Sequence, residues 1–154
     1  MPTPDERKEM IAKIANFPNI LEANITQFNE TQLDIPIGPG EWTVRQVIHH
    51  LADAHLNGYL RMKLILTEIK PILKPFDQEA WMGLVDVKGP IQSSLQILRG
   101  VHERWARFLE VLPEESWSRT GVHLENGLLN LDDLLVHFVH HGDTHIEQIN
   151  QLKI

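Results

Sequence analysis

The sequence contains no cysteine, and this absence removes several kinds of chemistry. Disulfides, thiolate ligands, iron–sulfur clusters and cysteine nucleophiles are excluded, which leaves histidine, aspartate and glutamate as the strong metal ligands. The chain also lacks an apolar run near the ~18–20 residues that a membrane-spanning helix needs, and its N-terminus has no apolar signal-peptide core. We therefore expect a soluble, cytoplasmic protein with no membrane partner.

Positive charge is scarce as well. Lysine and arginine number 14 against 21 aspartates and glutamates, for a formal net charge of −7. This average charge repels phosphate backbones, so we expect no nucleic-acid partner. A chain of 154 residues is the size of one ordinary domain, which we place at 1–154, and it needs no metal or disulfide to fold.

Apolar residues recur at helical spacing in four long segments, residues 4–28, 44–69, 90–112 and about 131 to the end. Pro18 interrupts the first segment, which predicts either a kink near Phe17 or two helices, with Asn16 capping the second. Thr43 is a good N-cap for the second segment, and Asn130 or Asp132 for the last.

The connections between these segments are rich in turn-forming residues. Residues 71–89 read as a long crossover loop with one helical turn at Gln78–Met82, and the Asn126-Gly127 pair favours a small hairpin. Four amphipathic helices bury their apolar stripes most simply against one another. The predicted fold is all-α, a four-helix bundle with a long crossover loop between helices 2 and 3.

The last helical segment carries His137, His141 and His145 at every fourth residue. Side chains four apart lie on one helix face about 5–6 Å from each other, so two of these imidazoles can share one metal ion. A helical wheel turns His141 and His145 toward the apolar face and His137 away from it. A third ligand is available in EWTVRQVIHHLADAH, where either His50 or His55 can face inward.

Four separated sequence words then carry a family resemblance: GPGEWTVRQVIHHLADAHLNGYLRMKLILTE, KPFDQEAW, LRGVHERW and HHGDTHIEQI. In this order and at this spacing, the chain resembles the DinB-like superfamily over nearly its whole length. The similarity is to the YfiT-like branch of metal-dependent hydrolases and thiol transferases. It implies a four-helix bundle with a three-histidine metal site, whose ligands here are His50, His141 and His145, and it suggests a homodimer.

The expected cofactor is one divalent transition metal, zinc or nickel first and iron or manganese next, because imidazole suits all of them. Asp53, one turn beyond His50, is the candidate catalytic residue, either as a hydrogen-bond partner of a metal ligand or as the base that accepts a proton. The candidate substrate-binding residues are Tyr59, Arg61, Trp81 and His102. We expect His49, His123, His137 and His140 at the surface.

Three functions fit this pattern. The first is transfer of a low-molecular-weight thiol to an electrophilic small molecule, with the metal holding the thiolate. The second is hydrolysis of a small ester or amide by metal-activated water. The third is a metal or small-molecule binding module without catalysis.

Overall fold

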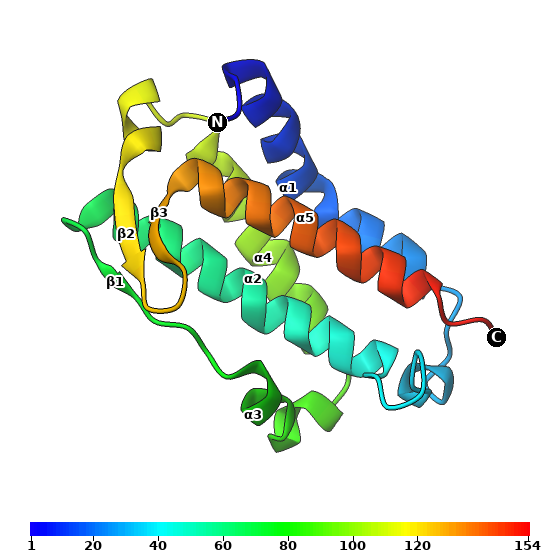
Figure 1. Ribbon diagram of the computed structural model, residues 1–154. Coiled ribbons are helices and arrows are strands. Elements are labelled where there is room, and N and C mark those ends of the chain that lie inside the picture. Colours follow the sequence, from blue (N-terminus) through cyan, green and yellow to red (C-terminus); the bar gives the residue numbers. More distant parts are fainter.

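Four long helices lie side by side in the computed structural model, which describes residues 1–154. They are α1 (Pro4–Ile25), α2 (Val44–Thr67), α4 (Gln92–Leu109) and α5 (Leu131–Asn150) (Figure 1). Both α1 and α2 pack against α4 and α5, so that α1 and α2 occupy opposite corners of the bundle. The predicted four-helix bundle is confirmed, with a small sheet added at one side.

Three of the helices begin with reciprocal capping. Thr3, Thr43 and Asn130 each accept a hydrogen bond from the backbone three residues later, and the side chain at that later position accepts one in return. Of the two caps considered for α5, Asn130 is therefore the one used. Asp132 is buried and instead accepts two hydrogen bonds from the guanidinium of Arg7, at 2.7 and 2.9 Å.

Helix α1 runs without a break through Pro18, so the alternative of two helices is wrong. Proline carries no N–H, so the carbonyl of Ile14, four residues earlier, cannot receive the usual helical hydrogen bond from that position. The helix continues because Phe17, Pro18 and Leu21 are buried against the rest of the bundle. It ends at Ile25 rather than near residue 28.

The connections supply short elements around the open ends of the bundle. They are η1 (Gln32–Asp34), β1 (Ile72–Leu73), α3 (Gln78–Met82), η2 (Val85–Lys88), η3 (Glu114–Ser118), β2 (Thr120–His123) and β3 (Gly127–Asn130). The predicted turn of helix at Gln78–Met82 is present, and so is the hairpin, which turns at Gly127 with φ +75°. Strand β1 was not predicted; it pairs in parallel with β2, giving the sheet order β1-β2-β3.

The apolar core falls into two clusters along the bundle. On α2, α4 and α5 the change from one cluster to the other spans a stretch that contains histidine. These stretches lie between Ala52 and Tyr59 on α2, Leu98 and Trp105 on α4, and Phe138 and Ile149 on α5. Together with His50, two residues before Ala52, their histidine rings form a histidine layer across the middle of the bundle. None of the helices is long and apolar enough to cross a membrane.

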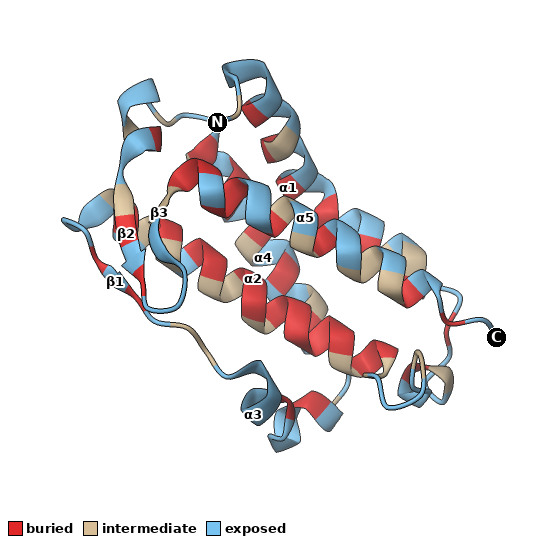
Figure 2. Cartoon of the chain, in the orientation of Figure 1, coloured by how far each residue is buried: buried red, intermediate tan, exposed pale blue.

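Two histidines expected at the surface are buried, and that expectation is wrong for them. His49 lies under α4 and the end of the crossover, where its ring nitrogens contact Ser94 Oγ at 2.7 Å and the Gly89 carbonyl at 3.0 Å. Figure 2 shows that buried residues extend around much of α2. The crossover covers a side of this helix that a simple two-faced wheel assigns to solvent. His123 ends β2 and is enclosed by its own hairpin, where its Nδ1 accepts from the backbone of Glu125 and Asn126. His137 and His140 are exposed, as expected.

Candidate metal centre

His50, His141 and His145 come together in the histidine layer, and we call this group the histidine triad. One potential ligand atom from each residue lies within 4.8 Å of the other two. His50 Nε2 faces His141 Nε2 at 3.2 Å, and the His145 ring lies 4.5 Å from that of His141 and 5.0 Å from that of His50, between centroids. Of the two histidines that the α2 wheel allowed to face inward, His50 joins the pair from α5.

The spacing of the triad fits a transition-metal ion. Two imidazole nitrogens bound about 2.05 Å from one tetrahedral ion are separated by about 3.3 Å, close to the observed separation of the two Nε2 atoms. The third imidazole is held in place from behind, because His145 Nδ1 donates to Gln148 Oε1 at 2.7 Å. That bond leaves the lone pair of His145 on Nε2, the form that coordinates a metal.

The surroundings of the triad keep its rings uncharged at neutral pH. Burial, and then the neighbouring His145, lower the pKa of His50 to about 4. Burial lowers the pKa of His141 to about 2, with further lowering by His145 and His50, and it also lowers the pKa of His145. Because metal ligation requires neutral imidazole, the three donors are available without first losing protons.

Aromatic side chains form a wall beside His50. The Trp42 ring lies 4.9 Å from the His50 ring, and Phe76 of the crossover lies 6.4 Å from it on another side. Trp81 from α3 packs on Phe76 at 4.7 Å and keeps 37% of its surface exposed. A hollow of about 510 Å³ opens between this segment and the hairpin, and its lining is Pro75, Phe76, Asp77, Gln78 and Glu125. Trp81 is thus linked to His50 through Phe76, and its predicted role in substrate binding stays a prediction.

His55 and His102 lie outside the triad but are hydrogen-bonded to it. His55 Nε2 is 3.0 Å from His141 Nδ1, and its other ring nitrogen is 2.7 Å from His102 Nε2. Both rings are fully buried. His102 also lines a separate hollow of about 210 Å³ between α1 and α5, together with Ile14 and Phe138, and none of the triad residues lines it. The substrate role of His102 stays a prediction. The contact between His55 and His141 was not predicted. The one sequence signal that bears on these buried rings is Pro18. Proline has no N–H to donate to the Ile14 carbonyl, and that carbonyl contacts His102 instead.

The other predicted site residues are placed at different distances from this centre. Asp53 is half-buried and does not join the triad; burial raises its pKa, followed by the nearby negative charge of Asp86, while His49 acts against the shift. Tyr59 sits in the apolar core, where its ring packs on Trp105 and Phe108 at 6.4 and 5.9 Å. The catalytic role of Asp53 and the substrate role of Tyr59 stay predictions.

Arg61 is a cation with incomplete pairing. Its Nη2 donates to the Lys74 carbonyl at 2.9 Å, while its Nε is buried without a hydrogen-bond partner. Burial lowers its pKa below the ordinary value, and Glu125 acts in the opposite direction. Burial lowers the pKa of His137, one helical turn before His141, and the positive charge of Arg61 lowers it further. Arg61 thus lies on the triad's side of the bundle, between α2 and α5.

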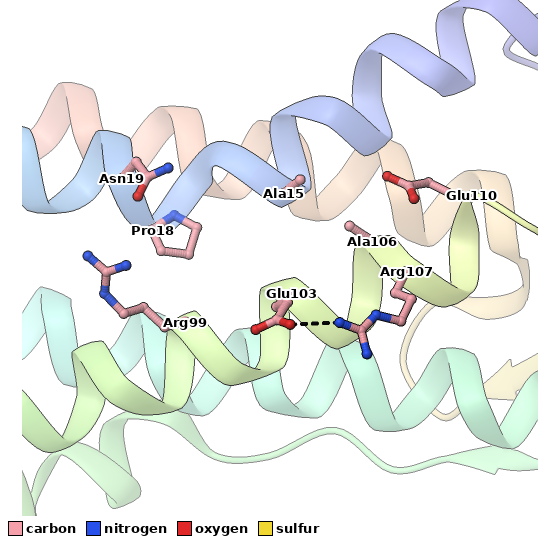
Figure 3. Close-up of a pocket in the computed structure, with 8 residues that line it drawn as sticks. All are labelled: Ala15, Pro18, Asn19, Arg99, Glu103, Ala106, Arg107 and Glu110. Carbon is pink, nitrogen blue, oxygen red and sulfur yellow. Dashed lines mark hydrogen bonds and ion pairs between the residues drawn. The ribbon is translucent and has the colours of Figure 1, made fainter.

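A second hollow, of about 490 Å³, lies at the opposite side of the bundle. Figure 3 shows it between α1 and α4, floored by Ala15, Pro18 and Ala106 and edged by alternating charges, including the Glu103–Arg107 ion pair. It contains none of the predicted site residues. Its walls offer neither histidine nor an aromatic ring.

Comparison with known proteins places this architecture in a family. A protein of Oceanobacillus iheyensis named "putative metal-dependent hydrolase" is 39% identical over 144 residues, which cover 94% of this chain and 84% of that protein. A Bacillus cereus protein of the same name is 40% identical over 143 residues, covering 93% and 83%. The solved structure of YfiT from Bacillus subtilis, described as a probable metal-dependent hydrolase with an unusual four-helix bundle topology, superposes with a TM-score of 0.95. It is 35% identical, and the match covers 99% of this chain and 88% of YfiT.

The sequence model for the DinB superfamily matches residues 16–149, a span that includes all three triad histidines and both buried histidines behind them. This match covers most of the chain, and the relatives above extend the similarity to both of its ends. The chain belongs to the DinB superfamily.

Proposed function

We propose that this protein is a metal-dependent hydrolase of a small ester or amide, with one divalent transition metal held by His50, His141 and His145. The observation that carries the proposal is the convergence of three neutral imidazoles within 4.8 Å at the aromatic wall. A divalent ion held by three imidazoles keeps an open coordination position and lowers the pKa of a water or thiol bound there. The names of the relatives favour hydrolysis over the thiol transfer that the sequence placed first.

Residues around the triad supply binding and proton transfer in this proposal. Trp81 and Phe76 cover the apolar part of a substrate, and the positive charge of the Arg61 guanidinium attracts a substrate carboxylate. Asp53 accepts the proton lost by the nucleophile, helped by a pKa that burial raises above the usual range. In hydrolysis the water oxygen adds to the carbonyl carbon, the bond to the leaving group breaks, and a water proton ends on the leaving alcohol or amine.

Thiol transfer is the second candidate, and the composition of the triad favours it. All three donors are neutral, with no carboxylate among them, so the full positive charge of a divalent ion remains to stabilise a thiolate. The sulfur would then bond to an electrophilic carbon and displace its leaving group. Zinc and nickel are the proposed metals, and the proposed partners are a small-molecule substrate and a second copy of this chain.

The deciding experiment loads the metal-free protein separately with zinc, nickel, manganese and iron(II) and follows two reactions. Turnover of a small ester or amide without thiol supports the hydrolase, and loss of free thiol only after an electrophile is added supports the transferase. The activity should disappear in His50→Ala and persist in His49→Ala, which removes the adjacent ring outside the triad. Metal binding without either reaction, in a closed coordination sphere, would leave a binding module. Sedimentation of the loaded protein tests the homodimer.

A further inference from the structure

We infer that His55 and His102 are positioning residues, which together fix the metal-binding tautomer of His141 from a backbone carbonyl on the far side of the bundle. We call these two residues the histidine relay. The inference rests on the proposed metal site, to which it adds residues that do not touch the metal. It follows from three distances and from the direction in which each hydrogen bond must run.

The relay starts at the carbonyl oxygen of Ile14 on α1. A carbonyl only accepts, so His102 Nδ1, 2.7 Å away, must carry a proton and donate it. The carbonyl is free for this contact because the residue four positions later is Pro18, which has no N–H to offer. The proline that interrupts the helical pattern of α1 thus provides the fixed acceptor at the start of the relay.

The direction then passes from ring to ring. With its proton on Nδ1, neutral His102 has its lone pair on Nε2 and accepts from His55 Nδ1 at 2.7 Å. His55 in turn has its lone pair on Nε2 and accepts from His141 Nδ1 at 3.0 Å. The lone pair of His141 is therefore left on Nε2, the atom that faces His50 in the triad. Each neutral ring has one donor and one acceptor, so the first bond determines the rest.

The packing around the relay prevents other arrangements. His55 and His102 have no exposed surface, and each of their ring nitrogens has a partner within 3.0 Å. Phe17 lies against both rings, with centroids 5.0 Å from His55 and 5.1 Å from His102, and Trp105 and Phe138 meet His55 edge-on. The opposite tautomers would turn a lone pair of His102 toward the Ile14 carbonyl and put a proton on the metal-binding nitrogen of His141. All four long helices contribute to this path, so the metal-binding form is set by the assembled bundle.

The first test observes the tautomers directly in the metal-free protein. Long-range ¹H–¹⁵N spectra of the full-length chain distinguish a protonated from an unprotonated ring nitrogen. We expect protons on Nδ1 of His102, His55 and His141. A proton on Nε2 of His141 with its Nδ1 bare contradicts the inference. This result does not depend on whether the protein binds metal, so failure of the proposed function and failure of the relay are separate outcomes.

The second test measures Zn²⁺ affinity by competition with a chromophoric chelator. His102→Leu removes both hydrogen bonds, and we expect affinity to fall by about 10–100-fold, as for other partners of metal-bound histidine. His102→Gln can donate to Ile14 and accept from His55, so its affinity should stay close to wild type. His49→Leu is the matched control, since it removes a buried α2 histidine with two hydrogen bonds outside the relay.

Wild-type affinity in a folded His102→Leu would overturn the inference, and so would equal losses in His102→Leu and His102→Gln, because ring shape would then matter more than hydrogen bonding. Circular dichroism establishes that each variant is folded. If His102→Leu does not fold, the nitrogen spectra of the wild type decide the question by themselves.

Discussion

The histidine triad and the histidine relay lie in the same layer of the bundle, but they differ in how their ring nitrogens are paired. In the relay every nitrogen of His55 and His102 is paired within hydrogen-bond distance, and both rings are closed off from solvent. In the triad the ring nitrogens point toward one another, and the Nε2 atoms of His50 and His141 lie 3.2 Å apart. Burial makes a histidine structural where its nitrogens are satisfied, and makes it a candidate ligand where lone pairs meet.

Acidic pH should break both groups, and this is the largest expected effect. Folding lowers the pKa of His50 and His102 to about 4 and of His141 to about 2, with burial as the first cause, and lowers those of His55 and His145 as well. Below the unfolded value of about 6.5, the unfolded chain therefore binds more protons than the folded one. Stability is complete above that pH and is lost as pH falls toward the folded values, by up to about 1.4 kcal/mol per group and pH unit.

Urea unfolding of the metal-free protein at pH 7.5 and 5.5 measures this loss, which should reach several kcal/mol because five groups contribute. Bound Zn²⁺ should reduce the loss at intermediate pH, since it competes with protons for the triad. An unfolding free energy that stays constant between the two pH values would show that the rings are not held in their neutral forms by the fold.

Closing the space between α2 and α5 should disturb triad and relay together. A Cβ on Gly58 would lie 2.4 Å from the Phe138 ring, which itself packs edge-on against His55. Gly58→Ala should therefore lower the free energy of unfolding by about 1–3 kcal/mol and weaken Zn²⁺ binding. The matched control is Gly100→Ala on α4, where nothing lies within 4 Å and helix propensity should raise stability by up to about 1 kcal/mol. Similar behaviour of the two variants would argue against the close packing described here.

Removing the outer aromatic wall should separate substrate binding from metal binding. Trp81 touches Phe76 but neither the triad nor the relay through its ring. In Trp81→Ala we expect KM to rise about tenfold, the equivalent of one aromatic contact, with Zn²⁺ affinity unchanged. Steady-state kinetics and metal titration on the same preparation measure both quantities. A changed metal affinity with unchanged KM would move Trp81 from the substrate side to the support of the triad.

The smallest effect should come from the start of the relay. Pro18→Ala restores an N–H that competes with His102 for the Ile14 carbonyl, while the better helix former favours α1. We expect Zn²⁺ affinity to fall only a few-fold, since a carbonyl oxygen has two lone pairs, and thermal stability to stay the same or rise. Chelator competition and a melting curve test the pair of outcomes. Loss of stability together with an unchanged affinity would contradict the role given to Pro18.

Helical spacing in the sequence predicts the bundle because the apolar stripes of α2, α4 and α5 extend over several turns. It also places His141 and His145 on the inner side of α5, where the structure has them. The wheel failed for His49, because a two-faced view of α2 takes no account of the crossover that packs over its outer side. Only the family resemblance distinguished His50 from His55 as a ligand, because both side chains face inward. They differ in their partners on other helices, since His50 contacts His141 and His55 contacts His102.

Long-range pairing was beyond the sequence for a physical reason. The relay joins His102 to a carbonyl 88 residues away and to His55 47 residues away, and no local pattern encodes such contacts. Strand β1 is similar: two residues are too few for a periodic signal, and Ile72 and Leu73 become a strand only because β2 is there to pair with them.

The central claim is that the three converging imidazoles hold one metal ion. Elemental analysis of purified wild type beside His141→Ala and His49→Ala tests it most directly. We predict roughly one divalent transition metal per chain in the wild type and in His49→Ala, and a strong loss in His141→Ala, because a site of three protein ligands is weakened when one of them is removed. Equal metal content in the wild type and in His141→Ala would contradict the account.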